Sequence, residues 1–364
     1  MSAEPVAATP APMEPVDAVE GKKVESVEAP TSTPALAAVE KHEAVAPAAD
    51  PNTVDIVPAA EKKLEPVPTL AEEKKAEAVP TAVEDNTSPP LTLLELFLAD
   101  LPAVIKEADY GEIWGVTLKD SSHVPTTIVL EKFLRANSKD VVKAKAQLGE
   151  ALKWRKKVNP LRLLAEEEFD EAKFGDLGFV TVYPKTEAHP KEIVTWNIYG
   201  AVKDNKATFG NIEEFIKWRA ALMELSVKEL DIASATEPIP VDGIDPYRMV
   251  QVHDYLNTSF LRMDPAIKAA SKETIQTFSM AYPELLKGKF FVNIPLLMGW
   301  VFSAMKVFLS PETVKKFHPL AYGNSLAGEL KTFGAELPEA YGGKGKAVKE
   351  GLTVKYAATP AATE

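Results

Sequence analysis

The chain contains no cysteine among its 364 residues, which excludes disulfide bonds and every metal site built on thiolates. Disulfides are typical of proteins from oxidising compartments, and the sequence gives no sign of one. The amino-terminal residues also lack the basic start and apolar core that form a secretory signal. We therefore expect a cytoplasmic protein.

Aromatic residues are absent from residues 1–88, which hold 12 of the 29 prolines. Such a segment cannot bury enough apolar surface to offset the entropy lost on ordering, so we predict a disordered tail there. The segment carries 17 acidic and 7 basic side chains and accounts for most of the net charge of −12. This acidic balance argues against nucleic acid as a partner.

Long apolar runs and the common catalytic motifs are also missing. The longest apolar stretch, residues 294–309, contains proline, glycine, serine and lysine and is shorter than the roughly 18 residues that a membrane span requires. The sequence has no nucleophile elbow, no phosphate-binding loop and no dinucleotide-binding glycine pattern. We expect a protein that touches membranes without crossing them and that is not an enzyme.

The spacing of apolar residues changes near residue 160 from helical to strand-like. Helical spacing, with a first helix entered through Ser88-Pro89-Pro90, predicts helices over residues 91–101, 128–136 and 141–157. Further along, strands are predicted at 178–184, 193–200, 249–255 and 290–295, and helices at 212–230, 266–281 and 296–309. This alternation predicts an α/β fold in which a helical bundle precedes a mostly parallel sheet. We expect little structure after Gly345.

One of the predicted strands ends with His253 and Tyr255, which stand two residues apart and therefore on one face. In a chain without cysteine, these two side chains are the best candidates for binding a soft or borderline metal. The pattern alone is weak evidence, because aromatic residues suit strands and a half-buried histidine is usually held by a hydrogen bond.

Several motifs, in order along the chain, resemble the CRAL-TRIO family of lipid-exchange proteins, typified by yeast Sec-fourteen. Residues 132–136 (Lys-Phe-Leu-Arg-Ala) and 152–155 (Leu-Lys-Trp-Arg) resemble the signature of the family's amino-terminal bundle. Residues 282–295, 308–314 and 337–343 resemble its late strand, gating helix and closing segment. The resemblance covers about residues 90–345 and implies a lipid-binding domain with a hydrophobic cavity and a gating helix.

Within this family the chain is most similar to the fungal Sfh-five branch, described as phosphatidylinositol transfer proteins that also bind haem. The resemblance implies a monomer that exchanges phosphatidylinositol and lies peripherally on endoplasmic reticulum or microsomal membranes, with roles in phosphoinositide homeostasis or the response to oxidants. The expected domains are a tail (1–88), a helical bundle (89–165), a lipid- and haem-binding domain (170–345) and a flexible carboxyl-terminal tail (346–364).

The resemblance also implies a binding site for the inositol phosphate headgroup. The family uses a glutamate in its Tyr-Pro-Glu motif and a lysine after the gating helix, and Glu284 and Lys316 fall on these positions. A further family lysine follows the Phe-Leu-Arg-Ala motif, where this chain has Asn137-Ser138-Lys139, so one cation is displaced or absent. The alternative is that Glu284 and Lys316 form an ordinary surface ion pair.

Haem b in the ferric state needs an axial donor, an apolar slot and cations for its propionates. We predict Tyr255 as the iron ligand and His253 as a supporting contact, because neighbours on one strand face cannot easily occupy opposite axial positions. Arg219 and Lys289 lie where residues approach the haem in the resembled branch, and we expect them at the propionates. Two alternatives stay open: a peroxidase or catalase-like enzyme, whose distal acid and base the sequence does not identify, and a haem sensor without lipid transfer.

Overall fold

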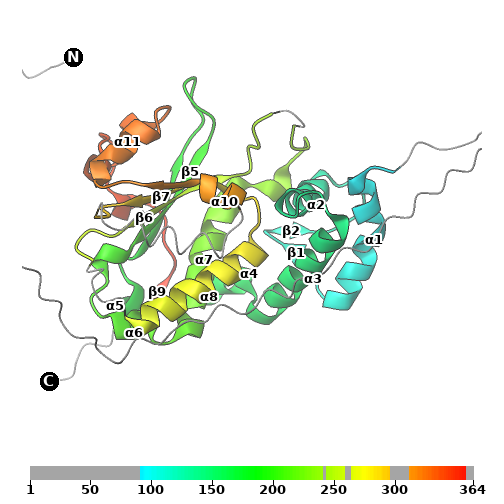
Figure 1. The fold of residues 1–364 in the computed structure, drawn as a ribbon, viewed down its shortest axis with the longest axis horizontal. Coiled ribbons are helices and arrows are strands. Elements are labelled where there is room, and N and C mark those ends of the chain that lie inside the picture. The colour runs from blue at the N-terminus through cyan, green and yellow to red at the C-terminus, as the bar shows by residue number, and fades with distance from the viewer. Residues whose placement is uncertain (1–90, 241–242, 259–263, 296–310, 358–364) are drawn as a thin grey trace, which may run out of the picture. The chain divides into compact units, whose positions relative to one another are not determined.

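The structure is a computed structural model that describes residues 91–240, 243–258, 264–295 and 311–357 (Figure 1). The predicted tail over residues 1–88, the predicted helix entry at Ser88-Pro89-Pro90 and the predicted gating helix over residues 296–309 lie outside these residues. Among the described residues no helix is long and apolar enough to span a bilayer.

The first helix begins at a residue that caps it. The Thr92 hydroxyl accepts a hydrogen bond from the Glu95 amide while the Glu95 carboxylate accepts one from the Thr92 amide, which forms a capping box. The helix then continues through Pro102, because its buried face extends to Ala108, so the predicted end at residue 101 is wrong. The helices of the bundle are α1 (Leu93–Ala108), α2 (Val124–Ala136), α3 (Val141–Val158) and α4 (Pro160–Glu166).

A short hairpin of β1 (Glu112–Ile113) and β2 (Val116–Thr117) follows α1. Its turn residues, Trp114 and Gly115, have φ values of 57° and 80°, as a type I′ turn requires. The turn directs the Trp114 ring into the core, where it stacks on Phe133 of α2.

The second part of the chain forms a five-stranded sheet in the order β4-β5-β6-β7-β8. The β4 and β5 strands are antiparallel and all other neighbours are parallel, which confirms the predicted mostly parallel α/β fold. Helices provide the crossovers that parallel strands need. The strands are β4 (Gly178–Tyr183), β5 (Glu192–Ile198), β6 (Met249–Asp254), β7 (Leu286–Val292) and β8 (Phe317–Pro319), and the main crossover helices are α7 (Ile212–Leu230) and α8 (Pro265–Ala281).

Alternate residues of each strand face different layers. Val250 and Val252 of β6 pack with Leu326 and other residues of the carboxyl-terminal segment, whereas Gln251 and His253 face α7 and α8. Figure 1 shows the bundle at one end of the described part of the chain and the sheet at the other. The shorter helices are α5 (Glu171–Phe174), α6 (Asn205–Phe209), α10 (Pro311–Lys315), α11 (Leu326–Glu329), η1 (Tyr199–Ala201), η2 (Ile232–Ser234), η5 (Gly323–Ser325), η6 (Gly334–Glu336), η7 (Glu339–Tyr341) and η8 (Val348–Glu350).

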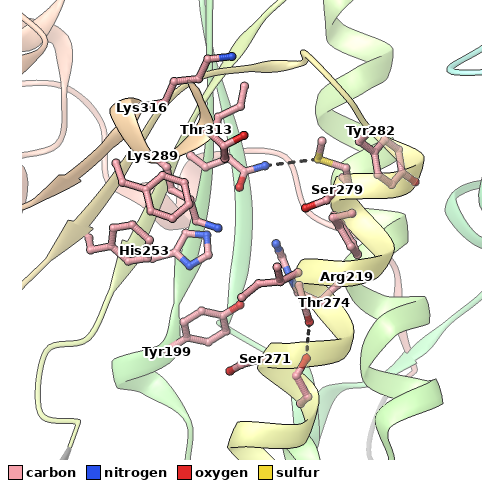
Figure 2. A pocket seen from close by; sticks show the side chains of 18 of the residues that line it. Tyr199, Arg219, His253, Ser271, Thr274, Ser279, Tyr282, Lys289, Thr313 and Lys316 are labelled. Atoms are coloured by element: carbon pink, nitrogen blue, oxygen red, sulfur yellow. Dashed lines mark hydrogen bonds between the residues drawn. The ribbon is translucent and has the colours of Figure 1, made fainter. Parts of the chain in front are cut away.

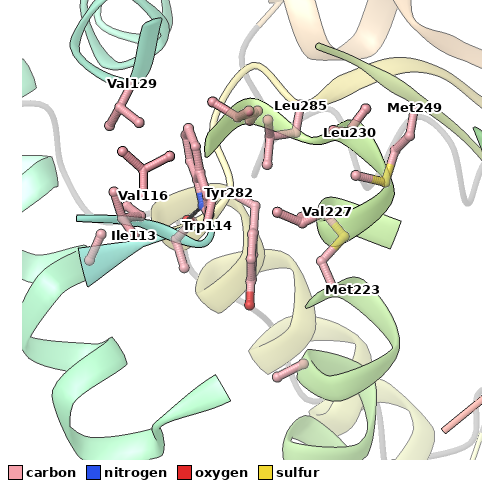
Figure 3. Close-up of a cluster of buried hydrophobic side chains, with 14 of the residues drawn as sticks. Ile113, Trp114, Val116, Val129, Met223, Val227, Leu230, Met249, Tyr282 and Leu285 are labelled. Atoms are coloured by element: carbon pink, nitrogen blue, oxygen red, sulfur yellow. Dashed lines mark hydrogen bonds between the residues drawn. The ribbon is translucent and has the colours of Figure 1, made fainter. Parts of the chain in front are cut away.

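The predicted bundle and the sheet share one hydrophobic core. Figure 3 shows Trp114 and Val129 of the bundle in the same cluster as Leu230, Tyr282 and Leu285. Helix α3 also packs directly against α8. The bundle is therefore continuous with the layer that lines the cavity described below.

The segment after Gly345 differs from the prediction. Strand β9 (Tyr356–Ala357) pairs in parallel with β3 (Phe169–Asp170), and Leu352 bridges to β4 through two backbone hydrogen bonds with Val180. The expectation of a flexible tail from residue 346 is therefore wrong as far as residue 357. The segment has too few apolar residues for a periodic signal, and its order depends on partners far away in the sequence.

Candidate functional site

A cavity of about 390 Å³ lies between the sheet and helices α7 and α8, within the size range of small-ligand sites. Figure 2 shows α8 along one wall, with Ser271, Thr274 and Ser279 facing side chains of the sheet. Aromatic rings and hydroxyl, amide and charged groups alternate around the wall. Such a lining suits an amphipathic ligand better than a purely apolar one.

The structure places His253 and Tyr255 together in this cavity, as the strand spacing predicts. Strand β6 ends at Asp254, but the Tyr255 amide donates to the Val292 carbonyl at 3.1 Å, so the ladder geometry continues one residue further. The two side chains therefore project from one face of the sheet into the same space.

Two further aromatic residues surround this pair. The Tyr199 ring centroid lies 5.4 Å from that of His253 and 5.6 Å from that of Tyr255. On β7, the Phe291 centroid lies 5.5 Å from His253 and 6.5 Å from Tyr255. Sequence reasoning missed Tyr199. It stands two residues after Asn197, which faces the cavity side of β5.

Burial keeps both polar groups of the pair uncharged. His253 is 5 % exposed, and no described residue forms a hydrogen bond with its Nε2 atom. Burial, with the nearby charges of Lys289 and Arg219, holds the pKa of His253 well below its ordinary value. Burial likewise raises the pKa of Tyr255 well above that of an exposed phenol, and the Arg219 charge opposes this only in part. A phenolate at Tyr255 thus needs a cation that displaces its proton.

Arg219 of α7 brings a guanidinium into the cavity wall. It is 2 % exposed and donates from Nη1 to the Asn197 side-chain oxygen, while no described residue accepts from its Nε. The guanidinium lies 5.5 Å from the Phe278 ring centroid and 5.8 Å from that of Trp218. No described aspartate or glutamate forms an ion pair with it.

Lys289 of β7 adds a second cation to the same wall. Its ammonium lies 5.5 Å from the ring centroids of both Phe291 and Phe317, and no carboxylate in the described part of the chain pairs with it. Burial, with the charge of Arg219, lowers the pKa of Lys289 to about 7. One buried and one partly buried cation, both without described carboxylate partners, favour a ligand that supplies negative charge.

Glu284 and Lys316 also line the cavity and pair with each other at 3.0 Å. Their side chains are 23 % and 19 % exposed, so the pair is more buried than an ordinary surface ion pair. Lys139, the cation nearest to the displaced family position, is exposed and lies outside the cavity wall. The structure therefore brings all six predicted ligand-binding side chains to one cavity wall. The one carboxylate among them, Glu284, pairs with Lys316.

The site residues fit a haem group on three counts. The His253 Nε2 and Arg219 Nε atoms are buried without described partners, Arg219 and Lys289 supply two cations, and aromatic rings provide a flat apolar wall. The Tyr255 side chain places a phenolic oxygen in this wall. Among the described residues no group of three or more His, Asp or Glu side chains could hold a bare metal ion.

The profile of the CRAL/TRIO domain matches residues 182–343. The chain is similar to "Phosphatidylinositol transfer protein sfh5" of Botryotinia fuckeliana, with 67 % identity over 264 residues, which cover 72 % of this chain and 60 % of that protein. The protein of the same name from Sclerotinia sclerotiorum is 65 % identical over 264 residues, 72 % of this chain and 64 % of that protein. The chain thus spans about three fifths of the length of these relatives.

A solved structure, "Crystal structure of Sfh5", has the same fold with a TM-score of 0.62 and 32 % sequence identity. The match covers 72 % of this chain and 90 % of that chain. Most of the sheet lies within the residues that the profile matches. The chain therefore belongs to the CRAL/TRIO domain family.

Proposed function

We propose that the protein is a non-enzymatic carrier that binds phosphatidylinositol in its cavity and exchanges it between membranes. The observation that carries the proposal is the Glu284–Lys316 pair on the cavity wall, where a carboxylate can accept from inositol hydroxyls and an ammonium can bind a phosphate. The relatives from Botryotinia fuckeliana and Sclerotinia sclerotiorum are named as phosphatidylinositol transfer proteins, which supports the same function. The carrier would act as a monomer in the cytoplasm and bind endoplasmic reticulum or microsomal membranes peripherally.

Replacing either Glu284 or Lys316 by alanine is expected to slow the transfer of labelled phosphatidylinositol between vesicles by about ten- to a hundredfold. Each change removes a charge-assisted hydrogen bond to the headgroup, which contributes about 1.5–3 kcal/mol. Lys315→Ala is the matched control, because Lys315 is 71 % exposed and its one ion pair with a described residue is to Glu312. Unchanged transfer in both variants would place headgroup recognition elsewhere.

A second candidate function is the binding of ferric haem b, with Tyr255 as the iron ligand. The specific observation is a pair of cations in the cavity wall, the buried Arg219 and the partly buried Lys289, beside a histidine whose Nε2 has no described partner. Arg219 and Lys289 would hold the two propionates, Tyr255 would give up its phenolic proton, and neutral His253 would pack beside the macrocycle. When bound, haem supplies a ferric centre that favours an anionic oxygen ligand. If the protein is a haem sensor, it should be coloured and should not transfer lipid. If it is a haem enzyme, it should consume peroxide.

The pKa of Lys289 predicts how anion binding depends on pH. Metal-free protoporphyrin carries the two propionates but no iron, so its binding tests the cations without Tyr255. Without a bound ligand, Lys289 has a pKa of about 7, and a bound anion raises this pKa. Above pH 7, binding of the anion is therefore coupled to the uptake of a proton by Lys289. Affinity should be fully present below pH 7 and fall as the pH rises through and above it. Porphyrin fluorescence titrations at several pH values measure this.

Lys289→Met provides the control for this profile. The variant keeps an unbranched apolar side chain and lacks the titrating amine, so its affinity should be lower and nearly independent of pH over the same range. Tyr255→Phe should leave porphyrin binding and its pH dependence nearly unchanged, since no iron bond is involved. A wild-type profile that is flat around pH 7 contradicts the assignment of Lys289.

A further inference from the structure

The carboxyl-terminal end of α8 is held by side chains of the amino-terminal bundle. The last carbonyls of a helix have no partner within the helix and need donors from elsewhere. Gln147 of α3 donates from Nε2 to the carbonyls of Ser279 and Met280, at 3.1 Å each. The Trp114 indole donates to the Ala281 carbonyl at 3.0 Å. Three successive carbonyls at the end of α8 are thus bound by two bundle residues.

The orientation of the Gln147 amide is fixed by a further bundle residue. Asn137 donates from Nδ2 to the Gln147 side-chain oxygen at 2.6 Å, so the Gln147 nitrogen faces α8. Asn137 also donates to the Phe133 carbonyl in its own helix. Asn137 belongs to the stretch in which the family lysine is displaced or absent, and its amide is used here to hold α8.

Another bundle residue, Lys132, forms a hydrogen bond with the backbone of Glu284, the glutamate of the headgroup pair. Lys132 of α2 is fully buried and donates to the Asp245 carboxylate at 2.7 Å, to the Tyr247 carbonyl at 2.8 Å and to the Glu284 carbonyl at 3.0 Å. Glu284 itself has a φ of 56°, a left-handed conformation that a non-glycine residue adopts at a cost. Such a conformation persists only where surrounding contacts fix it.

The side chain of Tyr282 is held by the same part of the molecule. Its hydroxyl donates to Glu224 at 2.7 Å, and Glu224 pairs with Arg155 of α3. Trp154, next to Arg155, also places its ring 5.9 Å from the Tyr282 ring in an edge-on contact. The short segment from Ala281 to Glu284 therefore receives contacts from α2, α3 and the β1–β2 turn.

We propose that the bundle takes part in headgroup binding and that Gln147, Trp114 and Lys132 are positioning residues. They fix the end of α8 and the left-handed turn at Glu284, and so aim the Glu284 carboxylate at Lys316 and the headgroup. The inference rests on the proposed carrier function and assigns a role to residues that act on the headgroup site through the backbone of residues 279–284, while the Gln147 side chain also lines the cavity. The bundle would thereby set the affinity for phosphatidylinositol.

A double-mutant cycle between Gln147 and Glu284 tests the proposal. Gln147→Met keeps the length of the side chain, leaves no buried charge and removes the two hydrogen bonds to α8 and the one from Asn137, so phosphatidylinositol transfer between vesicles should slow about three- to tenfold. If Gln147 acts through Glu284, the same change in a Glu284→Ala background should have no further effect. A merely structural role would lower transfer in both backgrounds alike, and that result would overturn the proposal.

Lys153→Met is the matched control, because Lys153 also lies on α3 but, among the described residues, pairs only with the exposed side chains of Glu107 and Glu150. Hydrogen exchange supplies a measurement that does not depend on lipid. In Gln147→Met and Lys132→Met the amides of residues 282–285 should exchange faster relative to those of β5, whereas Lys153→Met should resemble the wild type.

The two measurements separate the inference from the function on which it rests. Faster exchange at residues 282–285 with no transfer defect in Glu284→Ala would support the positioning role and contradict headgroup binding by Glu284. A transfer defect in Glu284→Ala with unchanged transfer and exchange in Gln147→Met would support the carrier function and overturn the positioning role.

Discussion

Protein with Tyr255→Phe is expected to be folded and colourless when purified from haem-replete cells that yield coloured wild-type protein. The change removes the phenolic oxygen that would bind iron and keeps the ring that packs between Tyr199 and Phe291. Because burial disfavours a phenolate, iron binding would have to deprotonate Tyr255, and phenylalanine offers no oxygen at this position. The absorption spectrum and the iron content per chain measure the effect.

Tyr199→Phe is the matched control for this prediction. It removes a hydroxyl from the neighbouring ring, so colour should persist if the iron bond belongs to Tyr255 alone. His253→Ala should reduce haem loading or shift the spectrum without abolishing it, since His253 lies beside the ligand on the same sheet face. A colourless wild-type protein, or Tyr255→Phe with unchanged haem, would leave only the lipid-carrier function.

Elements with a strong apolar period were predictable from the sequence. Helix α7 has the predicted limits of residues 212 and 230, because Asn211 caps its start and buried residues recur along its face. The placement of His253 and Tyr255 on one face follows from strand geometry alone, without knowledge of the fold. The identity of the ligand did not follow from such patterns, and the family resemblance supplied it.

Features that depend on long-range contacts were not predictable in this way. Lys132 stands in a helix pattern like any surface lysine, yet its partner Asp245 is 113 residues away and the pair is buried. Trp114 appears in the sequence as an isolated aromatic residue, although its turn directs it to the end of α8. Neither residue carries a local signal, because sequence spacing encodes only which face of an element is apolar.

Replacing Arg155 by methionine is expected to lower the free energy of unfolding by about 3–5 kcal/mol, the effect of removing one member of a buried ion pair. Arg155 is fully buried and donates to Glu224 at 2.6 Å and to Glu112 at 2.9 Å, and these bonds join α3 to α7 and to the hairpin. Methionine fills much of the space but leaves the Glu224 carboxylate, which is 1 % exposed, without its cation. Urea unfolding measures the loss.

Arg162→Met is the matched control, because Arg162 pairs with Glu166 at 3.5 Å while both side chains are more than half exposed. Its loss should lower the free energy of unfolding by less than about 1 kcal/mol. If the penalty in Arg155→Met comes from an unpaired buried carboxylate, adding Glu224→Met should restore much of the stability, since apolar packing can replace a buried ion pair. No recovery in the double variant would attribute the loss to packing around Arg155, and an Arg155→Met protein as stable as Arg162→Met would contradict the prediction.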